Sequence, residues 1–168
     1  QDEEYEFETP KDMKPHRGDP INIYAAPNIK ALDLSSMTDR LAGVTIAGVL
    51  DPLLGTKFKK FILGSPIAKN TEVSNISGLA NAKRLEHLDV RNMKGLTALD
   101  LSNQKNIQYV DARGSNITGI EFAVGASLQT LKMPAAMKVL KLEQLPYLSD
   151  LTSENNFLTL QTKLKKLK

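Results

Sequence analysis

The chain has 168 residues, of which 41% are hydrophobic and 24% charged, and its formal net charge is +3. This composition excludes a disordered tail and a membrane bundle, and the length is typical of about one domain. The absence of Cys and the presence of only two His exclude disulfides, thiolate metal sites, a Cys nucleophile and a His-rich zinc site.

Residues 1–20 hold seven acidic side chains against three basic ones, together with three prolines. This pattern predicts an acidic extended arm. The arm contains Arg17-Gly18-Asp19, an integrin-binding tripeptide, although three-residue matches are common by chance. The chain begins with Gln rather than Met, and we expect a processed product or a piece of something longer.

Residues 21–84 are interpreted as irregular N-terminal coils or a cap. Both Ile29-x-x-Leu32-x-Leu34 and Phe58-x-x-Phe61-x-Leu63 fit a six-residue unit that recurs more regularly later in the chain. Between these two units, residues 38–50 carry the capping and stop signals of a short helix. The segment 76–84 is expected to lead into the first regular strand.

A six-residue unit, apolar-x-x-apolar-x-apolar, recurs regularly across residues 85–153. Its last three positions alternate and fit a short strand with one buried face. Two units form a coil of roughly 20–22 residues that cannot close a core alone, so successive coils stack. The units start at Leu85, Leu96, Ile107, Ile117, Leu128, Met137 and Leu148. The predicted fold is therefore a β-rich (α+β) solenoid with irregular turns and little helix.

Successive units should alternate between two faces of the stack, with the third and fifth residues of each unit pointing outward. We expect the face with the larger side chains to bind a ligand or partner, and the face with small ones to pack against a neighbour. The predicted binding face is His87, Asp89, Tyr109, Asp111, Thr130 and Lys132; the predicted packing face is Ala98, Gly119 and Val139.

Charges on these faces lead to further expectations. Asp111 should pair with Lys132, and Glu121 with Lys141, whereas Asp89 and Asp111 should repel each other. These two aspartates could hold Ca²⁺, but solvated carboxylates on a sheet are the simpler interpretation, and no metal or cofactor is predicted.

The stretch LTALDLSNQKNIQYVDARGSNITGIEF, residues 96–122, resembles the LTxLDLSxNxxLxxL leucine-rich repeats of Bacteroidetes surface proteins and of phages infecting those bacteria. The resemblance covers residues 85–151. The family's turn-tying Asn falls on Gln104 and Ser115 in this chain. What the resemblance implies is a leucine-rich-repeat solenoid in an extracellular, virion or cell-surface setting.

Residues 154–168 end in four lysines and are predicted to form a basic amphipathic segment. No phosphate loop, catalytic triad or metalloprotease motif is present, and we expect no enzymatic activity. The leading hypothesis is a scaffold or docking module within a larger assembly, with a phage tail or capsid-associated component favoured. The alternative is an adhesin that binds protein or glycan. Protein partners are expected, without nucleic acid or a membrane span.

Overall fold

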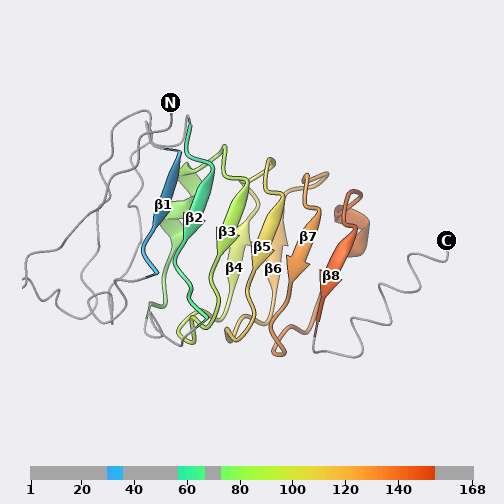
Figure 1. Ribbon diagram of the computed structural model, residues 1–168. Coiled ribbons are helices and arrows are strands. Elements are labelled where there is room, and N and C mark those ends of the chain that lie inside the picture. Colours follow the sequence, from blue (N-terminus) through green and yellow to red (C-terminus); the bar gives the residue numbers. More distant parts are fainter. Residues whose placement is uncertain (1–29, 36–56, 67–72, 154–168) are drawn as a thin grey trace, which may run out of the picture.

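The computed structural model describes residues 30–35, 57–66 and 73–153, which form a strand-rich fold with little helix (Figure 1). Every strand in these ranges is three residues long. The elements are β1 (Ala31–Asp33), β2 (Lys60–Ile62), η2 (Ser77–Asn81), β3 (His87–Asp89), β4 (Leu99–Leu101), β5 (Tyr109–Asp111), β6 (Ile120–Phe122), β7 (Thr130–Lys132), η3 (Leu142–Gln144) and β8 (Asp150–Thr152), where η marks a 3₁₀-helix.

The predicted acidic arm at residues 1–20, the short helix at 38–50 and the basic segment at 154–168 lie outside the described residues. The proposed division into four regions stays a prediction. Among the residues that the structure describes, no helix has the length and hydropathy that crossing a bilayer would require.

Six strands form one wholly parallel sheet in the order β1-β2-β3-β5-β7-β8, and Figure 1 shows them side by side in that order. The register shift between neighbours falls from 29 residues at β1–β2 to 22 at β3–β5 and 20 at β7–β8. Regular spacing therefore begins at β3, where the sequence repeat becomes regular.

The strands missing from that order, β4 and β6, pair with each other in parallel and form a second sheet. Units starting at Leu85, Ile107 and Leu128 thus contribute to the large sheet, and those at Leu96 and Ile117 to the small one. This arrangement confirms the alternation that the spacing predicts.

The unit beginning at Met137 departs from the pattern because it forms no strand. Pro134 precedes it, and the backbone N–H of Met137 donates to the Pro134 carbonyl (3.2 Å), which closes a tight turn. The chain keeps one bond to the small sheet, from Lys138 N–H to the Thr118 carbonyl (2.9 Å), and then enters η3.

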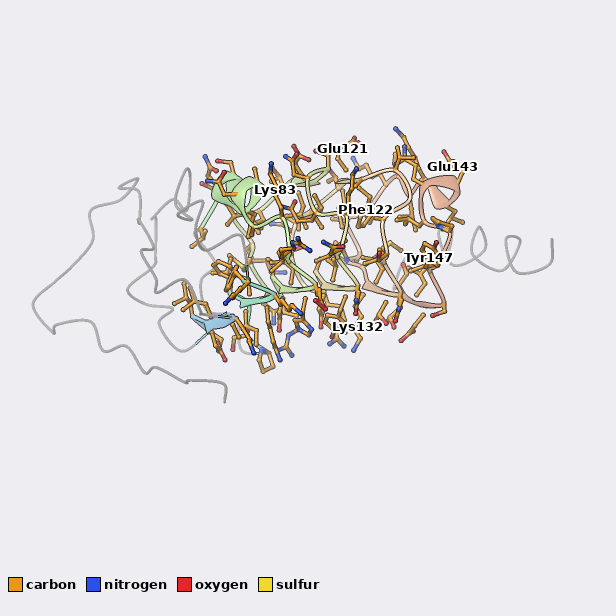
Figure 2. All side chains as sticks on the ribbon, turned by 90° about the horizontal axis from the view of Figure 1, so that it is seen from above. Lys83, Glu121, Phe122, Lys132, Glu143 and Tyr147 are labelled. Carbon is orange, nitrogen blue, oxygen red and sulfur yellow. The ribbon has the colours of Figure 1, made fainter. Side chains whose placement is uncertain are left out.

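Between the two sheets lies a continuous core of mainly aliphatic side chains; Figure 2, seen from above, shows the two layers and the labelled Phe122 between them. The middle residue of each central strand in the large sheet points inward and is fully buried, namely Phe61, Leu88, Val110 and Leu131. From the small sheet, Leu99, Leu101 and Phe122 face them. The ring-poor composition matches this geometry, because opposing three-residue strands enclose a narrow space.

Gly64 marks the closest approach between two backbones. A Cβ at this position would overlap the backbone nitrogen of Arg91 and lie 2.6 Å from its carbonyl oxygen. A methyl group at Gly64 could be accommodated only if the backbone around Gly64 moved away from the backbone at Arg91.

We therefore expect Gly64→Ala to lower the free energy of unfolding by about 2 kcal/mol or more, because overpacking against backbone cannot be relieved by a side-chain rotation. Gly119→Ala is the matched control, since a Cβ there meets nothing within 4 Å. Urea unfolding followed by circular dichroism measures both. Equal stability of the two variants would contradict the close approach.

Candidate partner-binding face

The outward row of side chains on the large sheet follows the predicted register: His87 lies beside Tyr109, Tyr109 beside Thr130, and Thr130 beside Asp150. The rings of His87 and Tyr109 are stacked, with centroids 4.2 Å apart and planes 9° from parallel. From the strand on the other side of Tyr109, the Lys132 ammonium lies 5.5 Å from the ring centroid.

Asp89 and Asp111 lie on the same outward side but are buried, with exposed fractions of 5% and 1%. The sequence-based expectation that these carboxylates are solvated is therefore wrong. Two arginines cover them. Arg91 contacts the Asp89 carboxylate at 2.8 Å, and Arg113 contacts the Asp111 carboxylate at 2.8 Å. Both pairs are bidentate, the geometry that makes guanidinium–carboxylate contacts strong.

Asp89 and Asp111 are neighbours, as predicted, and Arg91 offsets the expected repulsion between them. Arg91 lies 3.7 Å from Asp111 as well as against Asp89, and so places a positive charge between the two carboxylates. The Tyr109 hydroxyl also donates to Asp111, at 3.4 Å. We refer to His87, Asp89, Arg91, Tyr109, Asp111, Arg113 and Lys132 as the sheet-face cluster.

These aspartates share a local turn with two others in the fold. The Oδ1 of Asp33, Asp89, Asp100 and Asp111 each accepts the backbone N–H two residues later, at 2.9 to 3.2 Å. Such an Asx turn satisfies backbone where a strand ends, which explains the Asp of the LDLS pattern. At Asp100, hydrogen bonds from Ser102 lower the carboxyl pKa.

Arg91 and Arg113 belong to the sheet-face cluster but are absent from the predicted binding face. Each follows its aspartate by two positions, and side chains two apart in extended chain share a face. That Asp-x-Arg spacing, found at 89–91 and again at 111–113, was the available signal. The neighbouring carboxylates raise the pKa of both guanidinium groups.

Two predicted ion pairs are wrong. Lys132 lies over the Tyr109 ring and does not pair with Asp111, whose oxygens are already occupied by arginine. Lys141 does not pair with Glu121, because the segment that carries it forms no strand beside β6.

The two arginine pairs also bear on cation binding. A divalent ion at Asp89 and Asp111 would have to displace guanidinium groups already bound there. Within the described part of the chain, no group of three or more His, Asp or Glu side chains is arranged to hold a metal ion.

The opposite side of the molecule carries the predicted packing face. Ala98 and Val139 are exposed and Gly119 is half-buried. In Figure 2, Lys132 projects from one side of the layered structure and Glu121 from the other, which places the two faces back to back. Asp100 and Glu121 are aligned neighbours there, and both are exposed.

The pKa of His87 lies below the ordinary value for histidine. Burial is the main cause of its lowered pKa and nearby Lys60 adds to it, while Asp89 and Asp111 act in the opposite direction. The imidazole is therefore neutral at pH 7, which suits its stacking against Tyr109.

Comparisons of the chain with protein-family models, curated proteins and solved structures give no match. The interpretation of the face therefore relies on its own geometry.

Replacing Asp111 with Ala should lower the free energy of unfolding by about 2–3 kcal/mol, because charge-assisted bonds inside a buried cluster are lost. Asp100→Ala is the matched control: it removes an Asx turn of the same kind from an exposed site and should cost below about 1 kcal/mol. Urea denaturation measures both. Similar losses would show that the guanidinium contacts add no stability.

Stability should also depend on pH through His87. Its folded pKa lies below the unfolded value of 6.5, so the unfolded chain takes up a proton first as the pH falls. The free energy of unfolding should therefore decrease from pH 7 down to the folded pKa and level off below it. Denaturant titrations from pH 7.5 to 5 should show a shallower decrease for His87→Gln. Parallel curves would contradict the pKa shift.

Proposed function

We propose that the chain is a leucine-rich-repeat solenoid that acts as a non-catalytic scaffold or docking module in a larger assembly. Parallel strands recurring at 20–22 residues support this fold from β3 onward. Gln104 and Ser115, which stand where the family has its turn-tying Asn, support it further because both hydrogen-bond to backbone carbonyls in turns. The Gln104 amide donates to the carbonyls of Leu79 (2.6 Å) and Ala82 (3.4 Å) in the preceding turn. Ser115 bonds within its own turn, to Ala112.

The observation that carries the docking function is the sheet-face cluster. Its side chains are held by one another before any partner arrives, so little side-chain entropy remains to be lost on binding. Tyr and Arg are also the residue types that dominate binding energy at interfaces. Recognition suits this cluster better than proton transfer, because guanidinium groups already occupy both carboxylates.

The arrangement of the rings favours a polypeptide partner over a glycan. A sugar packs onto an open aromatic face, whereas His87 and Lys132 lie on either side of Tyr109, from the strands flanking it. The cluster therefore offers ring edges, one ammonium group and two guanidinium groups to its partner. These groups make hydrogen bonds and charge contacts with peptide.

The resemblance fits both a virion and a cell surface; because the repeats are degenerate and the acidic sequence of residues 1–20 suits contact with a neighbouring protein, we favour a tail or capsid-associated component of a phage. The alternative is a secreted or cell-surface adhesin. Mass spectrometry of purified virions from the source of this chain separates the two. Recovery of the chain in virions supports the first, and recovery only in the cell-surface fraction replaces it with the second.

Site-specific photocrosslinking tests the docking face inside the purified assembly. A photoreactive amino acid in place of Tyr109 should crosslink to a partner protein, whereas the same group in place of exposed Val139 is the control on the opposite side. Crosslinks from the Val139 position alone would assign docking to the predicted packing face. No crosslink from either position would overturn the docking function.

A further inference from the structure

The charges of the sheet-face cluster do not fully cancel across the central strands. Arg91 and Arg113 balance Asp89 and Asp111, and His87 is neutral. Two lysines remain: exposed Lys60 on β2 and Lys132 on β7. Within the described ranges neither forms an ion pair. Between β2 and β7 the face thus keeps two unbalanced positive charges, one on each side of the ring stack, while exposed Asp33 on β1 and Asp150 on β8 lie at the two ends of the sheet.

Arg113 adds unused donors to this surface. Its Nε and Nη2 donate to Asp111, but its side chain is 46% exposed. A guanidinium has five N–H donors, so those not directed at Asp111 can bind a carboxylate from outside. The Asp111 contact fixes the orientation of the guanidinium and so prepares it for that role.

We propose that this face docks an extended acidic polypeptide segment of a partner chain, with carboxylates on Lys60, Arg113 and Lys132; the proposal rests on the docking function above. From β2 to β7 there are three strand spacings, roughly 14 Å. An extended segment of six or seven residues spans roughly 20 Å and covers that distance. Spacing and charge together select a short acidic peptide lying across the strands.

This chain supplies a suitable probe in its own sequence. Residues 2–8 contain five acidic side chains and no basic one. A labelled synthetic peptide with the sequence of residues 1–9 can therefore be titrated with the full chain, and binding followed by fluorescence anisotropy at low and high salt. The peptide with each Glu replaced by Gln and Asp by Asn is the charge control.

The acidic peptide should bind the full chain, and the neutral peptide should not. The double variant Lys60→Gln with Lys132→Gln should weaken binding about tenfold, since each exposed charge contact contributes modestly. Lys138→Gln with Lys141→Gln is the matched control, because both lysines are exposed beyond the small sheet, and it should leave binding unchanged.

Three outcomes would overturn the proposal: no binding of the acidic peptide, equal weakening by both lysine pairs, or equally tight binding of duplex DNA. The last two would indicate general attraction of polyanions. If photocrosslinks from the Tyr109 position persist in the assembly while the peptide fails to bind, the docking function stands and only the acidic partner is rejected.

Discussion

The structure depends on the parallel register between strands of only three residues. Each strand is too short to be stable alone, and its backbone groups are satisfied by the strands before and after it. Because the register is maintained from β3 to β8 at shifts of 20–22 residues, equivalent side chains lie directly beside one another. Both the aliphatic core and the outward rows of side chains follow from that alignment.

The same alignment creates an electrostatic difficulty, which the sheet-face cluster relieves. Both β3 and β5 end in an Asx turn, so Asp89 and Asp111 become neighbours in a buried place. Two carboxylates without counter-ions would be costly there. Arg91 and Arg113, each two positions after its aspartate, bind the carboxylates and neutralise their charge. The network combines turn formation, charge balance and a rigid surface.

The two sides of the molecule differ in what they offer a partner. On the large sheet, stacked rings and paired charges occupy the surface in fixed positions. On the opposite side, the predicted packing face of Ala98, Gly119 and Val139 contains no ring and no charged group. The interruption after Pro134 also ends the small sheet at two strands. A docking role for the large sheet is thus consistent with its greater length and chemical variety.

From the sequence alone, the apolar spacing determined which residues are buried and that strands alternate between two layers, because side chains alternate along extended chain. It also predicted the outward row of His87, Tyr109 and Thr130. The tertiary structure decided the charge contacts. Arg91 reaches Asp111 only because β3 and β5 are adjacent, and Lys132 lies over Tyr109 because arginine already occupies Asp111. The periodicity determines which way each side chain points and how the strands align. Which charged groups pair depends on which strands are adjacent, and only the tertiary structure decides that.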